Sequence, residues 1–246
     1  MKLSFVIPAH NEEKFIGECL KSVLKEVGEK HPDRVEIIVV NNNSTDDTGK
    51  VAGAFKNVKV VDETKKGLSA ARHAGYLAAT GDLIANIDAD TVLTPGWIDK
   101  VFAAFEKNEK LVGFSGPYIY YDLSPLANIG VRAFYYLGFL TSLANRFILN
   151  KGAMLQGGNF VVRRSALDKI GGYNLEFEFY GEDTDIARRL HTVGDVVFSF
   201  KLPMYTSGRR LQEEGVVTMG LKYGANYVWT LVFKKPLTKK VKNIKK

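Results

Sequence analysis

The sequence of 246 residues has one cysteine, no long apolar run and no charge excess over most of its length. Cys19 cannot form an internal disulfide or build a metal site alone, so a disulfide-stabilised fold is excluded and a reducing compartment is expected. No segment reaches the roughly 18 uninterrupted apolar residues of a spanning helix, since the closest, 123–145, is interrupted by Arg132. The N-terminal apolar run stops at Pro8, too early for a signal peptide. We therefore expect a cytoplasmic protein.

The excess of positive charge is confined to the C-terminal end. The chain has 34 Lys plus Arg, 27 Asp plus Glu and a net charge of +7, whereas residues 234–246 hold seven lysines and no acid. The remaining body is neutral, which disfavours a nucleic-acid-binding protein. Aromatic residues in 123–149 and 216–233, beside the lysines, are typical of binding to an anionic membrane surface. A core helix with a solubilising tail remains the alternative.

The first 115 residues or so alternate short β-rich runs with amphipathic helices, which predicts an α/β fold with a mostly parallel sheet flanked by helices. Cys19 lies on the apolar stripe of the first helix and is expected in the core. The second half is mixed, with predicted strands and helices but no linker, so one α/β unit is expected. The predicted strands are 3–7, 35–40, 58–61, 83–87, 160–163 and 196–200, with an extended segment at 117–121. The predicted helices are 12–27, 44–55, 67–79 and 126–149, with others opening at Pro95 and near Glu182.

Polar clusters follow three of these strands, at 8–12, 41–46 and 88–90. Open α/β sheets bind ligands at the carboxyl ends of their strands, so these clusters should lie at one edge. Asp88 and Asp90 share a face if the chain is extended there, and two carboxylates suit Mg²⁺ or Mn²⁺ with phosphate oxygens completing the coordination. An Asp-x-Asp triplet alone is also typical of a polar turn, but its position after an apolar strand favours a metal site.

Five motifs, in this order, resemble those of the family 2 glycosyltransferases. They are P-A-H-N-E at 8–12, V-V-N-N-N-S-T-D-D-T at 39–48, G-L-S-A-A-R-H-A-G at 67–75, G-D-L-I-A-N-I-D-A-D at 81–90 and G-E-D-T-D at 181–185. The resemblance covers roughly residues 3–200. It implies a GT-A fold, a nucleotide-diphosphate sugar donor, a divalent metal, Mg²⁺ or Mn²⁺, and transfer with inversion at the anomeric carbon.

The resemblance also implies a set of nucleotide-binding residues, which are Pro8, Ala9, His10, Glu12, Asn42, Arg72 and Asp88. His10 stands where the family often has tyrosine, with a surface turn as the alternative. Asn42 lies where the family usually has aspartate, and an amide that both donates and accepts can still read a base. Arg72 is expected to face the nucleotide, unless it is a helix-surface charge. Asp90, with Asp88 near the ribose, is expected to hold the metal and stabilise the departing diphosphate.

Inversion with a hydroxyl acceptor requires a carboxylate to take the proton. The resemblance assigns this role to Asp183, with Glu182 as the alternative base; a helix-start acid pair is the structural alternative. Gly157, Gly158 and Asn159 are expected to flank the sugar or acceptor, since glycine permits close approach of a ligand. Arg209 and Arg210 either bind the diphosphate or are solvated loop charges.

The acceptor predicted on these grounds is a hydroxyl of a saccharide or glycolipid, because a lipid phosphate is already ionised and needs no base. Transfer to a polyprenyl phosphate is the alternative, and a nucleotidyltransferase or a non-catalytic sugar-nucleotide binder fits the motifs less well. We expect a catalytic domain at 1–215, with a donor half at about 1–116 and an acceptor half at about 117–215. Residues 216–246 form an apolar, aromatic segment and a basic tail. The expected setting is cell envelope glycan synthesis, in the cytoplasm or peripherally on the inner face of the cell membrane.

Overall fold

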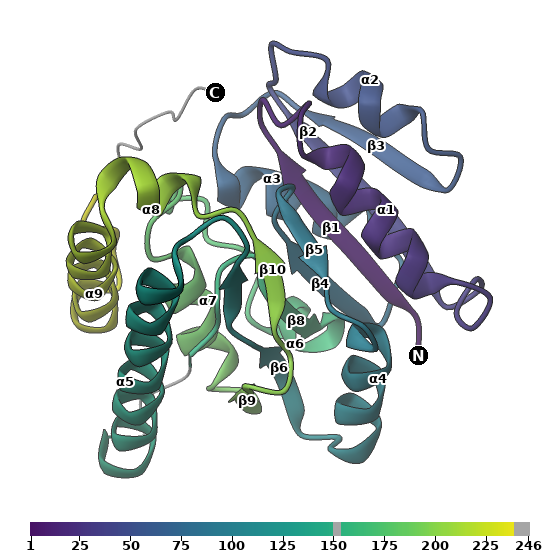
Figure 1. Cartoon of the computed structure of the whole chain (residues 1–246). Helices are drawn as coiled ribbons and strands as arrows, with labels where there is room; N and C mark the ends of the chain where they lie inside the picture. Colours follow the sequence, from purple (N-terminus) through teal and green to yellow (C-terminus); the bar gives the residue numbers. More distant parts are fainter. Residues whose placement is uncertain (150–153, 239–246) are drawn as a thin grey trace.

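The computed structural model describes residues 1–149 and 154–238 (Figure 1). Its strands are β1 (Leu3–Ala9), β2 (Val35–Asn42), β3 (Val58–Glu63), β4 (Leu83–Ile87), β5 (Thr91–Leu93), β6 (Leu111–Ser115), β7 (Tyr118–Tyr120), β8 (Asn159–Arg163), β9 (Asp195–Phe198) and β10 (Met204–Thr206). Its helices are α1 (Ile16–Val27), α2 (Thr48–Gly53), α3 (Leu68–Ala78), α4 (Trp97–Lys107), α5 (Pro125–Leu149), α6 (Arg164–Lys169), α7 (Glu182–Leu190), α8 (Arg209–Glu214) and α9 (Val216–Phe233).

A seven-stranded sheet, in the order β3-β2-β1-β4-β8-β6-β9, forms the centre of the molecule. β8 runs antiparallel to both of its neighbours, and the other pairs in this sheet are parallel. All seven residues of β1 are buried, as expected for a central strand covered on both faces. A second sheet, β5-β10-β7, lies beside the first. The expected α/β GT-A architecture, with a mostly parallel sheet and a mixed second half, is confirmed.

Two apolar cores lie on the two faces of the large sheet. α1 and α4 cover one face, where Cys19 is buried as the helical stripe predicted. α3, α6 and α7 supply the core of the other face. Trp97, fully buried, packs against Phe5 with ring centroids 5.7 Å apart, and its indole N–H donates to Asn159 Oδ1 at 3.2 Å. Satisfying this polar atom lets a large aromatic ring lie inside the core.

Several elements differ from those predicted. α1 begins at Ile16, not Glu12, because residues 12–15 form a turn in which Glu12 O accepts the N–H groups of Phe15 and Ile16. β6 was not predicted, since its five residues include Gly113, which interrupts the apolar run. β5 and β10, three residues each, exist through their pairing with one another, and local sequence carries little signal for them.

The C-terminal apolar segment forms helix α9, which packs against α7 and α8 and beside α5 (Figure 1). Thr230 is fully buried at this contact, next to Gly181, which precedes α7. Within the described residues, no helix has both the length and the apolar character that crossing a bilayer requires. Five of the seven lysines of the predicted basic tail, from Lys239 onward, lie outside the described residues.

The close contact between α3 and the sheet leads to a stability prediction. A Cβ added at Gly75 would lie 2.2 Å from Val6 Cγ1, whereas one added at Gly130 of α5 would meet nothing within 4 Å. Gly75→Ala should therefore lower the free energy of unfolding by about 1–3 kcal/mol through overpacking, measured by urea denaturation. Gly130→Ala, the matched control, should raise it by up to about 1 kcal/mol. Equal stability of the two variants would contradict this packing.

Candidate active site

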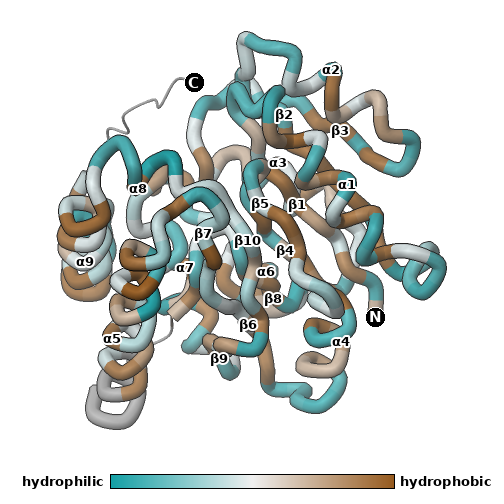
Figure 2. Tube along the Cα trace, in the orientation of Figure 1, coloured by the Kyte–Doolittle hydropathy of each residue, from teal (hydrophilic) through white to brown (hydrophobic). Residues whose placement is uncertain are grey.

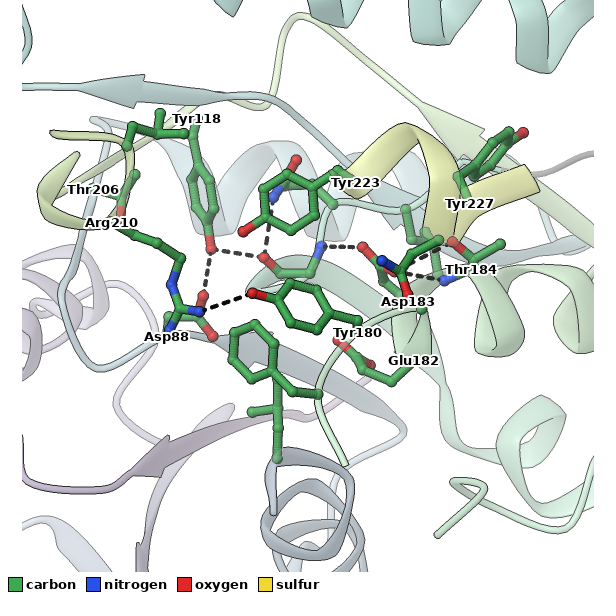
Figure 3. Close-up of a pocket in the computed structure, with 18 of the residues that line it drawn as sticks. Asp88, Tyr118, Tyr180, Glu182, Asp183, Thr184, Thr206, Arg210, Tyr223 and Tyr227 are labelled. Atoms are coloured by element: carbon green, nitrogen blue, oxygen red, sulfur yellow. Dashed lines mark hydrogen bonds between the residues drawn. The ribbon is translucent and has the colours of Figure 1, made fainter. Parts of the chain in front are cut away.

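A pocket of about 2660 Å³ opens at the carboxyl ends of the central strands and continues between α5 and α9. Polar side chains of β7, α7 and α8 meet at its wall with Asp88, which follows β4 (Figure 3). Thirteen of the residues expected at a site line this pocket: Pro8, Ala9, His10, Glu12, Asn42, Arg72, Asp88, Asp90, Gly157, Glu182, Asp183, Arg209 and Arg210. Segments far apart in the sequence are thus brought together at one sheet edge.

Three carboxylates and one arginine form the first part of the site. Arg209, from α8, forms an ion pair with Glu12 and lies 3.2 Å from Asp90 Oδ2. Burial raises the pKa of Asp90 to about 7; Arg209 opposes this shift, and the charges of Asp88 and Glu12 add to it. One guanidinium therefore faces more negative charge than it neutralises.

This donor set fits a divalent cation. Asp88 and Asp90 supply carboxylate oxygens, the ligands that Mg²⁺ and Mn²⁺ prefer. Glu12 pairs with Arg209 through Oε1, and its Oε2 is buried without a hydrogen-bond partner, which leaves one carboxylate oxygen unused nearby. In the part of the chain that the structure describes, no group of three His, Cys, Asp or Glu side chains is arranged to enclose a metal. The residues therefore suit an ion that keeps several water or phosphate oxygens.

Asp88 is held by Tyr118, a residue that the sequence did not point to. The Tyr118 hydroxyl lies 2.9 Å from both Asp88 Oδ2 and Gly157 O, and it can donate to one of them (Figure 3). Burial, followed by the charge of Asp88, keeps the pKa of Tyr118 far above its usual value, so it remains a neutral donor. No motif marks Tyr118, because its position depends on the pairing of β7 with β10.

Arg72 is completely buried although it lines the pocket, so it is not a helix-surface charge. It forms an ion pair with Glu182, and its Nη2 lies 3.4 Å from Asp88 Oδ1. Burial raises the pKa of Glu182 to about 7, while Arg72 opposes this shift. Arg72 therefore links the carboxylate that follows β4 to the first residue of α7.

The two acids that begin α7 have different surroundings. Glu182 is paired with Arg72, whereas the hydrogen bonds that Asp183 accepts from the residues described in the structure come from neutral donors. Its Oδ2 accepts from Gly157 N–H at 3.3 Å, and its Oδ1 from Thr184 N–H at 2.7 Å. Burial raises the pKa of Asp183 above the ordinary value of a carboxyl. Of the two acids, Asp183 is the one at the pocket that has no arginine or lysine partner among the described side chains.

Three residues expected at the ligand have structural roles. Asn42 donates to Glu63 O at 3.1 Å and Lys65 O at 2.8 Å and accepts from Gly67 N–H, so its amide fastens a loop at the pocket wall. Asn159 is fully buried and donates to Gly116 O and Leu202 O at 3.0 Å each.

Gly158 also lies behind the pocket wall. Its φ is +81°, and a Cβ there would lie 2.1 Å from Asp88 Oδ2 and 2.2 Å from the Tyr118 hydroxyl. Glycine is therefore needed for the backbone to approach Asp88, in place of the expected contact with a sugar. Gly157, by contrast, lines the pocket.

The remaining expected residues line the pocket near the end of β1 and at α8. His10 Nδ1 is 2.8 Å from Asn42 O, which orients its half-buried ring at the pocket. Arg210 Nη1 lies 3.5 Å from the Tyr180 hydroxyl, and its guanidinium stacks 4.5 Å from the centroid of the Phe179 ring. Arg209 stacks similarly on Phe15, at 4.6 Å. Both arginines are thus held at the pocket, and neither is a freely solvated loop charge.

Comparison with known proteins finds two matching family models. The model described as "Glycosyl transferase family 2" matches residues 4–171, and "N-terminal domain of galactosyltransferase" matches residues 141–209. The chain is 31% identical over 206 residues to the "Probable glycosyltransferase YdaM" of Bacillus subtilis, covering 78% of this chain and 47% of the relative. It is 30% identical over 127 residues to "Glycosyltransferase GlyG" of Streptococcus pneumoniae, covering 50% and 40%. The chain spans about half the length of these curated relatives or less.

Solved structures share the fold at low identity. A mannosyltransferase from Pyrobaculum calidifontis, in complex with GDP-Man and Mn²⁺, superposes with a TM-score of 0.69 at 18% identity, covering 95% of this chain and 63% of that one. Glucosyl-3-phosphoglycerate synthase from Mycobacterium tuberculosis, in complex with Mn²⁺ and UDP-glucose, gives a TM-score of 0.62 at 20% identity, covering 94% and 78%.

The buried ion pair leads to a second stability prediction. Arg72→Met should lower the free energy of unfolding by about 3–5 kcal/mol, because it leaves the Glu182 carboxylate buried without its cation. Arg34→Met breaks the exposed pair with Glu106 and, as the control, should cost no more than about 1 kcal/mol. Adding Glu182→Gln to Arg72→Met should recover part of the loss. Urea denaturation followed by circular dichroism measures all three, and an Arg72→Met variant as stable as the control would contradict the prediction.

Proposed function

Since the chain belongs to glycosyl transferase family 2, we propose that it is an inverting enzyme that transfers a sugar from a nucleotide-diphosphate donor to a hydroxyl of a saccharide or glycolipid. The observation that carries this proposal is the presence of two groups of carboxylates in one pocket. Asp88 and Asp90 form one group, near Arg209. Asp183 belongs to the other and accepts a hydrogen bond from Gly157 in the pocket wall. The first group suits a divalent cation that binds the leaving diphosphate, and the second suits a base for the attacking hydroxyl.

The donor binds, in this proposal, at the ends of β1 and β4. Pro8, Ala9 and His10 form the wall for the nucleoside, and Arg210 faces the diphosphate with a guanidinium that can make charge-assisted hydrogen bonds. The nucleotide sugars in the similar structures, GDP-Man and UDP-glucose, support a donor of this class.

Asp90, with Asp88, would hold Mg²⁺ or Mn²⁺ in this site. When bound, the ion supplies positive charge that stabilises the departing diphosphate. Asp90 is ready for such a partner because it is buried among like charges, and Arg209 is its cation in the present structure. Binding of the ion to Asp90 would weaken or break the ion pair between Asp90 and Arg209. The Arg209 guanidinium would then be available to the phosphates.

Asp183 would accept the proton of the attacking hydroxyl. Hydrogen bonds from Gly157 and Thr184 orient its carboxylate, and burial raises its pKa, which makes it a better base than an exposed aspartate. Burial also raises the pKa of Glu182, to about 7, but Glu182 is less suited because its ion pair with Arg72 occupies one carboxylate oxygen and holds the side chain in place. Glu182 would instead keep α7 and the base in position.

The alternative acceptor is a polyprenyl phosphate, which the apolar extension of the pocket between α5 and α9 favours. We also propose that residues 1–116 serve mainly the donor and 117–215 the acceptor, while 216–246 locate the enzyme. The lysines from 234 onward support a peripheral location on the inner face of the cell membrane, in cell envelope glycan synthesis.

Asp183→Asn should reduce kcat by a factor of about 100 to 10,000 and leave the dissociation constant of the donor nearly unchanged. Asp185→Asn makes the same change of charge on the same helix, but Asp185 is paired with Arg188 and Arg189, so kcat should fall far less. The donor is first identified by a thermal-shift panel of UDP-, GDP- and dTDP-sugars with Mn²⁺. Unchanged transfer to a hydroxyl by Asp183→Asn would exclude it as the base. Retained transfer to a polyprenyl phosphate alone would favour the alternative acceptor.

Asp90→Asn should weaken Mn²⁺ binding by at least about tenfold, measured by electron paramagnetic resonance in the presence of the nucleoside diphosphate. Asp99→Asn, an exposed acid paired with Lys30, is the control and should bind Mn²⁺ normally. EDTA should abolish transfer, and added Mn²⁺ should restore it. Equal Mn²⁺ affinity of the two variants would remove Asp90 from the metal site.

A further inference from the structure

Two neighbouring helices carry most of the large apolar side chains that are exposed in the described structure. α5 contributes six and α9 seven. Figure 2 shows the two helices side by side, each with brown, hydrophobic stretches. They are Leu126, Ile129, Phe134, Tyr136, Leu137 and Leu140 on α5, and Val217, Leu221, Tyr223, Val228, Trp229, Val232 and Phe233 on α9. We call these thirteen side chains the α5–α9 face. So many exposed apolar side chains on two adjacent helices mark an interaction site.

The charged residues of the two helices that carry this face are all of one sign, and the acid nearest to α9 in the sequence, Glu214 of α8, is paired with Lys222 of α9. Residues 125–149 and 216–238 contain no Asp or Glu. Arg132 is exposed on α5, and Lys234 and Lys235 are exposed where α9 ends. Trp229 and Phe233 stack with ring centroids 4.1 Å apart, immediately before these lysines. An aromatic pair beside basic residues suits the boundary between lipid headgroups and acyl chains.

The pocket also connects to this face. From Asp183 it continues between α5 and α9, where Phe134, Leu137, Val228 and Val232 line it. This part of the pocket is open at Gly130, where an added Cβ would meet nothing within 4 Å. A molecule anchored in a surface against α5 and α9 can therefore reach Asp183 without leaving that surface.

We propose that the α5–α9 face docks on an anionic lipid bilayer, with its apolar side chains at the acyl-chain boundary and Arg132, Lys234 and Lys235 against the headgroups. Charge complementarity selects this occupant, because a second copy of the chain would place like charges against each other. The docking itself does not depend on the proposed sugar transfer. If that function holds, docking places the acceptor end of the pocket at the bilayer, where the hydroxyl of a lipid-anchored acceptor is located.

The two tryptophans make the docking directly measurable. Trp229 is 37% exposed on the α5–α9 face, whereas Trp97 is fully buried in the core. Vesicles of phosphatidylcholine and phosphatidylglycerol with brominated acyl chains should quench the fluorescence of the Trp97→Phe variant, which retains Trp229. They should leave the Trp229→Phe variant unquenched. Phosphatidylcholine alone should quench weakly. Equal quenching of both variants, or of neither, would overturn the proposal.

Substitutions at the face separate docking from folding and catalysis. Leu140→Glu and Phe233→Glu replace exposed residues outside the pocket lining and should abolish vesicle binding; Leu77→Glu, on α3 and 65% exposed, should not. Lys234→Ala with Lys235→Ala should weaken binding about 30-fold at low salt, from the contribution of each lysine near an anionic surface.

Two further measurements identify other outcomes. Transfer to a soluble acceptor should be unchanged in Leu140→Glu, so that its loss would point to damage of the site and not to failed docking. Sedimentation velocity tests the competing occupant. A dimer that Leu140→Glu dissociates, in a protein that does not bind vesicles, would assign the face to a second copy and overturn the proposal.

Discussion

The ion pairs of the buried Arg72 are the interaction on which the site depends. The positive charge of a guanidinium without exposed surface must be compensated. Glu182 and Asp88, which lie far apart in the sequence, supply the compensating negative charge. The pairing fixes the start of α7 relative to β4 and so fixes the position of Asp183. Arg72 reaches these acids because its helix, α3, packs closely on the sheet. At Gly75 of this helix the contact is so close that there is no room for a side chain.

The sequence predicted the sheet and the location of the site better than the roles of single residues. Apolar runs and the polar residues after them are local patterns, so β1, β2, β4 and the cluster at Asp88 and Asp90 could be predicted. Whether a polar side chain faces a ligand or the protein depends on neighbours distant in the sequence. Asn42 and Asn159 looked like ligands, yet each fastens backbone carbonyls. Tyr118 looked like any aromatic residue of an extended segment, although it contacts Asp88.

Backbone geometry sets the spacing of the site as much as charge does. Gly158 adopts a left-handed conformation that brings its Cα against Asp88. Gly157 directs its carbonyl to Tyr118 and its N–H to Asp183. Both glycines precede β8, the antiparallel strand inserted between β4 and β6. The turn before this inserted strand therefore lies between Asp183 and the pair Asp88 and Asp90.

Gly157 connects the two groups of carboxylates through its own backbone atoms. Its carbonyl lies 2.9 Å from the Tyr118 hydroxyl, which also reaches Asp88, and its N–H donates to Asp183. These two atoms belong to the two peptide groups that flank the Gly157 Cα, so a displacement of Gly157 changes both hydrogen bonds at once. Any such effect is reciprocal by linkage: a ligand that alters Asp183 through this residue is altered in its affinity by one that alters Asp88, by the same factor. The turn before β8 is thus a hydrogen-bonded path between the two ends of the pocket.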